Sequence, residues 1–226
     1  MRRIEPDRAR AAMVASYQAV TDDVSKLDEE QLARPSRCLG WSRGDLLFHM
    51  LLDAQRALVT FATPAAAEPD VDFASYWAPF QPGAAGYLGQ ARFIRRIASS
   101  FESDLAIVAL WTETAAAAAR AAALLPAEIK VATQGHVLAA ADFLATLAVE
   151  ATIHHLDLTA GEASLAGPSG PGLAVTRETL DGVLGQPVPA YWDDVTYALK
   201  ATGRAELTDN DRVSLGELAT RLPLLG

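Results

Sequence analysis

The sequence has few of the features that stabilise a chain covalently or direct it into a membrane. Its 226 residues include one cysteine, Cys38, which excludes an internal disulfide framework. No stretch of about 20 residues is free of both charges and helix breakers, so no membrane span is predicted. The charged first residues lead into no apolar segment of the kind found in signal peptides. We therefore expect a cytoplasmic protein with no membrane partner.

Positive charge and aromatic side chains are also scarce. The 19 lysines and arginines are outnumbered by 28 aspartates and glutamates, which gives a net charge of -9. An acidic protein repels phosphate backbones, so a nucleic-acid partner is not expected. Aromatic residues make up 7% of the chain although half of it is apolar, and alanine, the strongest helix former, is prominent. This composition favours helices.

Hydrophobic periodicity and helix-boundary residues predict an all-α fold. Ser42 is a good N-cap for the second helix, with Asp45 placed to complete a capping box, and Pro64 ends that helix. A small hairpin is predicted at 131–138. Four long helices with one long crossover predict a four-helix bundle. The helical patterns cover 6–26, the segment from Ser42 to Pro64, 87–125 with a break near Ser99-Ser100, and 140–160.

Three segments are predicted to be irregular. Residues 27–40 are expected to be a loop, and 63–86, with four prolines, a long loop that serves as a lid, a binding loop or ordinary surface packing. The stretch GPSGPG at 167–172 is predicted to be a linker. It divides a bundle domain, 1–166, from an extension, 167–226. The short helices expected in that extension cover 175–184, 190–201 and 214–222.

The residues that suggest chemistry lie on the helix at 140–160. This helix is apolar nearly all round, which predicts burial, yet Glu150, His154 and Asp157 share one face. A buried carboxylate is costly unless it is paired, and a metal ion would satisfy it. His49, at the edge of the apolar stripe of the second helix, would be a third ligand, and Asp157 would orient an imidazole. Two histidines and one glutamate leave a coordination position open, as in catalytic zinc sites. A buried Glu–His ion pair is the alternative.

The other polar residues have simpler interpretations. His155 points about 100° away from His154 and is predicted to be a packing histidine. His136 is expected to be exposed in the hairpin. Cys38 is interpreted as a small apolar residue in a turn rather than a nucleophile. One cluster of basic residues consists of Arg92, Arg95 and Arg96. It either binds an anionic substrate or forms an exposed helix face.

Two segments resemble a known family. CLGWSRGDLLFH, from Cys38 to His49, resembles the first metal motif of the DinB-like superfamily, in which a Gly-Trp-Ser turn opens the helix that carries the first histidine. The segment from Asp142 to Leu158 is similar to the Glu-xxx-His-xx-Asp helix of the same proteins. The closer resemblance, over roughly residues 6–165, is to the N-terminal domain of mycothiol-dependent maleylpyruvate isomerases.

The resemblance implies a metal, zinc by preference, on His49, Glu150 and His154 in a four-helix bundle. Nickel, cobalt or manganese would also suit these ligands. It further implies a low-molecular-weight thiol as cosubstrate, with mycothiol the first choice, and a small electrophile as substrate. The expected activity is thiol S-transfer or cis-trans isomerisation. The alternatives are a metal-binding protein without catalysis and a biosynthetic or detoxifying enzyme with another electrophile.

The C-terminal part departs from the resembled family. Full-length isomerases of this type carry a sterol-carrier-like α/β domain there, whereas residues 167–226 have the pattern of short helices. The substrate contacts that such a domain supplies are therefore expected to be missing or replaced, and a substrate other than maleylpyruvate is expected.

Overall fold

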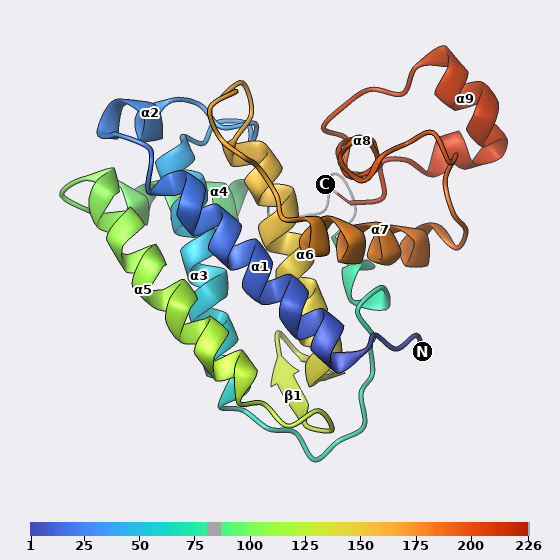
Figure 1. Cartoon of the computed structure of the whole chain (residues 1–226), viewed down its shortest axis with the longest axis horizontal. Coiled ribbons are helices and arrows are strands. Elements are labelled where there is room, and N and C mark those ends of the chain that lie inside the picture. Colours follow the sequence, from blue (N-terminus) through green and yellow to red (C-terminus); the bar gives the residue numbers. More distant parts are fainter. Residues whose placement is uncertain (81–86, 226) are drawn as a thin grey trace.

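The computed structural model describes residues 1–80 and 87–225 of the chain, and four long helices form its main body (Figure 1). These helices are α1 (Pro6–Val24), α3 (Arg43–Phe61), α5 (Asp104–Ala123) and α6 (Ala140–Leu158). Helix α1 packs against α5 and α6, and α3 packs against the same two helices. The predicted all-α four-helix bundle is confirmed.

Local signals in the sequence fix where the first bundle helices begin. At α3, the Ser42 side chain accepts from the Asp45 backbone N–H and the Asp45 carboxylate accepts from the Ser42 N–H, each at 3.0 Å, which completes the predicted capping box. At α1, the Glu5 carboxylate accepts from the N–H groups of Asp7 and Arg8, while Pro6 occupies the first turn. These bonds satisfy backbone donors that a helix start otherwise leaves unpaired.

The predicted loop at 27–40 is wrong in part, because it contains the short helix α2 (Glu29–Ala33). Asp28 and Gln31 form a reciprocal capping box there, a signal that a pattern based on apolar residues does not register. The expected break near Ser99-Ser100 is confirmed, since α4 (Tyr87–Ala98) ends just before it and α5 follows.

The long crossover contains one turn of 3-10 helix, η1 (Ser75–Trp77), in which Tyr76 and Trp77 are buried. Residues 81–86 of the predicted loop lie outside the described residues. The hairpin is confirmed as β1 (Lys130–Thr133) paired antiparallel with β2 (His136–Ala139). Gln134 and Gly135 in its turn have φ angles of 48° and 83°, as the favoured two-residue hairpin turn requires.

The linker predicted at 167–172 is corrected, because helix α7 (Gly170–Leu184) begins inside it. Ser169 is the N-cap, and Pro171 lies in the first turn, where its missing N–H has no cost. The helices that follow are α8 (Asp194–Ala201), α9 (Asp209–Leu215) and the 3-10 helix η2 (Gly216–Arg221). The helix predicted at 175–184 lies within α7, and the one predicted at 190–201 began too early. The helix predicted at 214–222 corresponds to the end of α9 and to η2, so most of α9 was missed. The domain boundary at residue 166 stays a prediction.

The extension lies against the bundle rather than apart from it. Helix α7 packs on α1 and α6, and α8 packs on α7 and α6 (Figure 1). Near the end of the chain, the Leu224 N–H donates to the Ala201 carbonyl, which holds the last residues beside α8. The extension is therefore placed to contribute side chains to a site on α6.

Helix α6 is the centre of the core. Seventeen of its 19 residues are buried, and the two that are not are Glu150 and His154, which line a cavity instead. Helix α5 has the length and apolar composition of a membrane span, but its Ile107, Trp111 and Ala118 are buried in the bundle. Because α5 packs between α1 and α3 in the bundle, its length and composition are weak evidence for a membrane span.

Candidate metal centre

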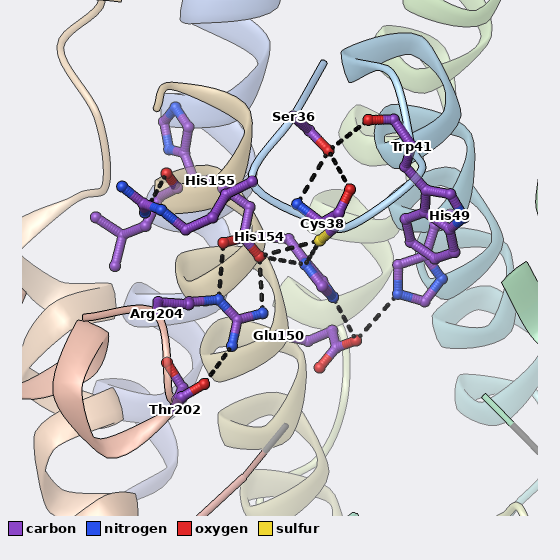
Figure 2. A network of polar contacts seen from close by, with 12 residues as sticks. Ser36, Cys38, Trp41, His49, Glu150, His154, His155, Thr202 and Arg204 are labelled. Atoms are coloured by element: carbon purple, nitrogen blue, oxygen red, sulfur yellow. Dashed lines mark hydrogen bonds and ion pairs between the residues drawn. The ribbon is translucent and has the colours of Figure 1, made fainter. Parts of the chain in front are cut away.

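Helices α3 and α6 bring together the three predicted ligands. The Glu150 Oε1 atom lies 3.2 Å from His49 Nε2 and 3.2 Å from His154 Nε2. The two imidazole rings meet edge to face with their centroids 4.9 Å apart. Figure 2 shows the Glu150 carboxylate between the two rings, with His49 approaching from α3.

This arrangement fits a single zinc ion by its donor types and spacing. Tetrahedral zinc with bonds of 2.0–2.1 Å holds neighbouring ligand atoms about 3.3 Å apart, close to the separations of the Glu150 oxygen from each imidazole nitrogen. One donor atom from each of the three residues lies within 4.8 Å of the others. The same contacts are also normal for hydrogen bonds, so metal ligation by His49, Glu150 and His154 stays a prediction.

A carboxylate and an arginine fix the orientation of His154. The Asp157 Oδ2 atom lies 3.1 Å from His154 Nδ1, so Nε2 is the nitrogen directed at Glu150. Arg204, which follows α8, donates from Nε to Asp157 Oδ1 and from Nη2 to Oδ2, both at 2.7 Å (Figure 2). The expected role of Asp157 in orienting an imidazole matches this geometry, because carboxylates commonly support metal-binding histidines in this way.

Cys38 lies closer to this network than predicted. Its Sγ atom donates to Asp157 Oδ2 at 3.3 Å and lies 3.8 Å from His154 Nδ1. Although its side chain also packs against the core, the interpretation as a purely apolar turn residue is incomplete. Cys38, His154 and Asp157 form a second group with metal-ligand spacing. Arg204 makes that group unsuitable for a cation, because its guanidinium already bonds both oxygens of Asp157.

The charges in the cluster depend strongly on one another. Burial disfavours an ionised Glu150, but the imidazoles of His154 and His49 hold the pKa of its carboxyl well below the usual value. Burial likewise opposes a charged His154, yet Glu150 and Asp157 raise the pKa of its imidazole well above 6.5. In the absence of a metal, the imidazolium of His154 therefore balances these carboxylates, and a metal ion would replace its proton.

The cluster lies between two adjoining cavities. The large lobe, of about 270 Å³, is lined by Cys38, Trp41, His154 and Arg204, among others. The small lobe, of about 90 Å³, is lined by Asp53, Arg56, Tyr76, Gln134 and several apolar side chains. Both lobes include His49, Trp77, Phe80, Gln90 and Glu150 in their walls. A ligand in either lobe can therefore reach the cluster.

The remaining histidines lie away from the cluster. His155 is buried and its Nε2 lies 3.0 Å from Asp23 Oδ2 on α1, which confirms the predicted packing role. His136, in the hairpin, is partly exposed rather than fully so, and pairs with Asp70 at 2.8 Å. Neither residue lines the two lobes.

Sequence reasoning missed most of the residues that line the two lobes, and four of them matter most for the cluster. Arg204 and Leu225 come from the extension, and nothing in their local sequence signals a position beside α6. Trp77 comes from the long crossover, where the Tyr76-Trp77 pair was the available hint. Asp53 is one turn beyond His49, and burial raises the pKa of its carboxyl to about 6 although the nearby His49 imidazole opposes this.

The bundle and its His-Glu-His cluster define a DinB-like helical protein. A family profile described as the mycothiol maleylpyruvate isomerase N-terminal domain matches residues 14–159, and the chain belongs to this family. The matched region includes His49, Glu150 and His154 but ends before Arg204.

One solved structure with the same fold is the crystal structure of a histidine-to-alanine mutant of the mycothiol-dependent maleylpyruvate isomerase. It aligns with a TM-score of 0.55 and 17% sequence identity, over 80% of this chain and 70% of that one. At this identity the similarity shows the fold. None of the curated proteins matches this sequence.

Proposed function

We propose that this protein is a metal-dependent, thiol-using enzyme, with zinc on His49, Glu150 and His154 and a low-molecular-weight thiol as cosubstrate. The observation that carries the proposal is the convergence of these three donors at the junction of two cavities. Three protein ligands leave one position open for a substrate, which is the pattern of catalytic zinc sites. Membership of the mycothiol maleylpyruvate isomerase family supports mycothiol as the thiol.

Zinc bound at this position would favour the thiolate form of the cosubstrate, which is the nucleophilic form. The thiolate sulfur would then add to the electrophilic carbon of a polarised double bond in the second substrate, and the π electrons would move onto its activating group. If the resulting anion takes up the proton released by the thiol, the C–S bond persists and the reaction is an S-transfer that forms a thioether. If the double bond opened by the addition rotates and the thiol is then eliminated, the reaction is a cis-trans isomerisation.

The protein residues position the reactants and exclude water. Asp157 holds the Nδ1 side of His154, which leaves Nε2 directed at the cluster. The large lobe suits the bulkier thiol, and the small lobe suits a small electrophile. Arg56 would attract an anionic group of the electrophile, since it is the one cationic side chain that lines the small lobe within the described residues. Trp77 forms part of both walls and limits access of bulk water.

The first experiment is elemental analysis of the purified protein beside two single variants, His154→Ala and His136→Ala. We expect about one equivalent of zinc in the wild type and in His136→Ala, and loss of the metal in His154→Ala. His136 is the matched control because it is a histidine outside both lobes. Absence of metal from reconstituted wild type would contradict the proposal and leave Glu150 and His154 as a buried ion pair.

Turnover separates the enzyme from a metal-binding protein without catalysis. The metal-loaded protein should consume small electrophiles, such as activated alkenes, faster when mycothiol is present than when it is absent. The His154→Ala variant should show no thiol-dependent rate. Metal binding without any thiol-stimulated turnover would favour the alternative of a non-catalytic protein.

A further inference from the structure

A third hollow opens beside the large lobe and carries a cluster of arginines. This groove, of about 800 Å³, lies between the Leu39–Trp41 turn and helix α4, from which Arg92, Arg95 and Arg96 line it. All three arginine side chains are exposed. The predicted exposed helix face is therefore confirmed, but it borders a concave surface and not a convex one.

These arginines form no ion pair with the residues that the structure describes. Within the described residues, none of the three has a carboxylate oxygen within 4.0 Å, although acidic residues outnumber basic ones in the chain. Asp45 is the acidic residue in the groove wall, and its Oδ2 accepts from the Ser42 N–H as part of the helix cap. Acidic partners lie beside six of the 13 other arginines, namely Arg8, Arg10, Arg34, Arg43, Arg177 and Arg204. What sets Arg92, Arg95 and Arg96 apart is that three arginines without such a partner in the described part of the chain line one groove.

Their spacing along α4 makes the cluster unfavourable without a partner. Arg92 lies three and four residues before Arg95 and Arg96, and like charges at these spacings repel one another on a helix. The helix dipole favours Arg95 and Arg96, which are in the last turn, but it offers little to Arg92. A bound anion would relieve the repulsion of all three.

The groove adjoins the cavity that contains the proposed metal ligands. Leu39 and Trp41 line both the groove and the large lobe. The Trp41 ring packs on His49 with centroids 5.3 Å apart, while Leu39 is 88% exposed at the rim. An elongated ligand with its reactive end at His49 and His154 would therefore pass Trp41 and Leu39 and end among the arginines.

We propose that this groove binds a multiply charged anionic group, phosphate or clustered carboxylate, at the far end of a substrate whose reactive end reaches the metal ligands. The proposal rests on the proposed function for the reactive end, but the groove itself can be tested without it. The anionic group belongs either to the electrophile or to a low-molecular-weight thiol that carries such a group. Arginine suits this role because its guanidinium makes paired hydrogen bonds to phosphate and carboxylate oxygens.

The test uses inorganic pyrophosphate as the probe in calorimetric titrations at low ionic strength. The protein is stripped of metal and dialysed free of chelator, so that the probe cannot bind through a metal. The test variant carries Arg92→Gln, Arg95→Gln and Arg96→Gln together. The control variant carries Arg3→Gln, Arg120→Gln and Arg212→Gln, which remove the same charge from exposed arginines that line none of the cavities described above.

We expect the wild type, the control variant and His154→Ala to bind pyrophosphate alike, and the test variant to bind it at least about tenfold more weakly, since hydrogen bonds to charged groups are lost. Retention of binding by His154→Ala separates the groove from the metal site. Absence of binding to the wild type, or equal weakening in test and control variants, would overturn the proposal.

Inhibition of thiol-dependent turnover by pyrophosphate shows which of the two substrates carries the anionic group. Competition with the thiol assigns the anionic group to the thiol, and competition with the electrophile assigns it to the electrophile. In the test variant we expect the KM of that one substrate to rise about tenfold while kcat stays near the wild-type value, because the arginines lie away from the reacting atoms. Inhibition that is unchanged in the test variant counts against the groove.

Discussion

Replacement of Arg204 by glutamine should weaken metal binding although Arg204 is not a proposed ligand. Arg204 makes two hydrogen bonds of 2.7 Å to Asp157, whose side chain is fully buried, and Asp157 in turn bonds His154. Glutamine carries no charge and cannot make the paired contact. Asp157 would then be less firmly held, and with it the ring of His154.

The size of the effect follows from the burial of this pair. Removal of one partner of a buried ion pair costs about 3–5 kcal/mol. Arg204 is 15% exposed and Asp157 keeps its contacts with His154 and Cys38, so we expect the lower end of that range. Loss of a group that bonds a metal-binding histidine directly lowers metal affinity by about 10–100-fold. Arg204 acts on His154 through Asp157, so we expect a loss of about tenfold, at the lower end of that range.

Two measurements test this reasoning. Urea unfolding of the metal-free protein should show the loss of stability, and competition with a chromophoric chelator should show the loss of zinc affinity. Arg177→Gln is the matched control, because Arg177 is also in the extension but pairs with Asp194, which is 38% exposed. That variant should lose less stability and keep its zinc affinity. Wild-type zinc affinity in Arg204→Gln would refute the proposed link from the extension to the metal site.

Three further predictions concern pH and packing. Burial alone would lower the pKa of His154, but Glu150 and Asp157 raise it, so zinc must displace a proton from the imidazole. The affinity of the protein for zinc should therefore increase by up to about tenfold per pH unit until the imidazole is neutral. A zinc affinity that does not change with pH in chelator competition would contradict this. Burial raises the pKa of Asp142 to about 6 from 3.8 in the unfolded chain, so the folded state favours the neutral acid and loses stability as pH rises through 6. Asp142→Asn should accordingly raise the free energy of unfolding at pH 8 by up to about 3 kcal/mol and leave it unchanged at pH 4. An equal gain at both pH values in urea titrations would count against the raised pKa of Asp142. A Cβ atom on Gly172 would lie 2.2 Å from Ser16 Oγ, so Gly172→Ala should lower the free energy of unfolding by about 1–3 kcal/mol. Gly170→Ala is the control and should not lower it, because no atom lies within 4 Å of the added Cβ. Similar melting temperatures for the two variants would contradict the packing of α7 on α1.

The main helices and the central cluster could be predicted because their signals are local. Ser42 and Asp45 are three residues apart and form the cap of α3 through their own backbone, whatever the rest of the chain does. Glu150 and His154 are one turn apart on α6, so their common face follows from helix geometry. The assignment of His49 as their partner needed the resemblance as well, because no local rule joins positions on two helices.

The errors at helix ends have a similar physical basis. Polar capping residues began α2 and α7 where the apolar pattern gave no helix, and the proline and glycine content of 167–172 suggested a linker. Pro171 is compatible with the first turn of a helix, so composition alone could not distinguish a linker from a helix start.

The sequence by itself determined that the chain forms a helical bundle and that Glu150 and His154 face one way on a buried helix, since both depend on periodicity within single segments. Only the tertiary structure decided which distant groups meet them. It placed Arg204 on Asp157, the Cys38 sulfur beside His154, and the arginines of α4 in a groove that adjoins the large lobe. Such contacts join residues far apart in the chain, and they depend on how helices pack rather than on any spacing along one of them.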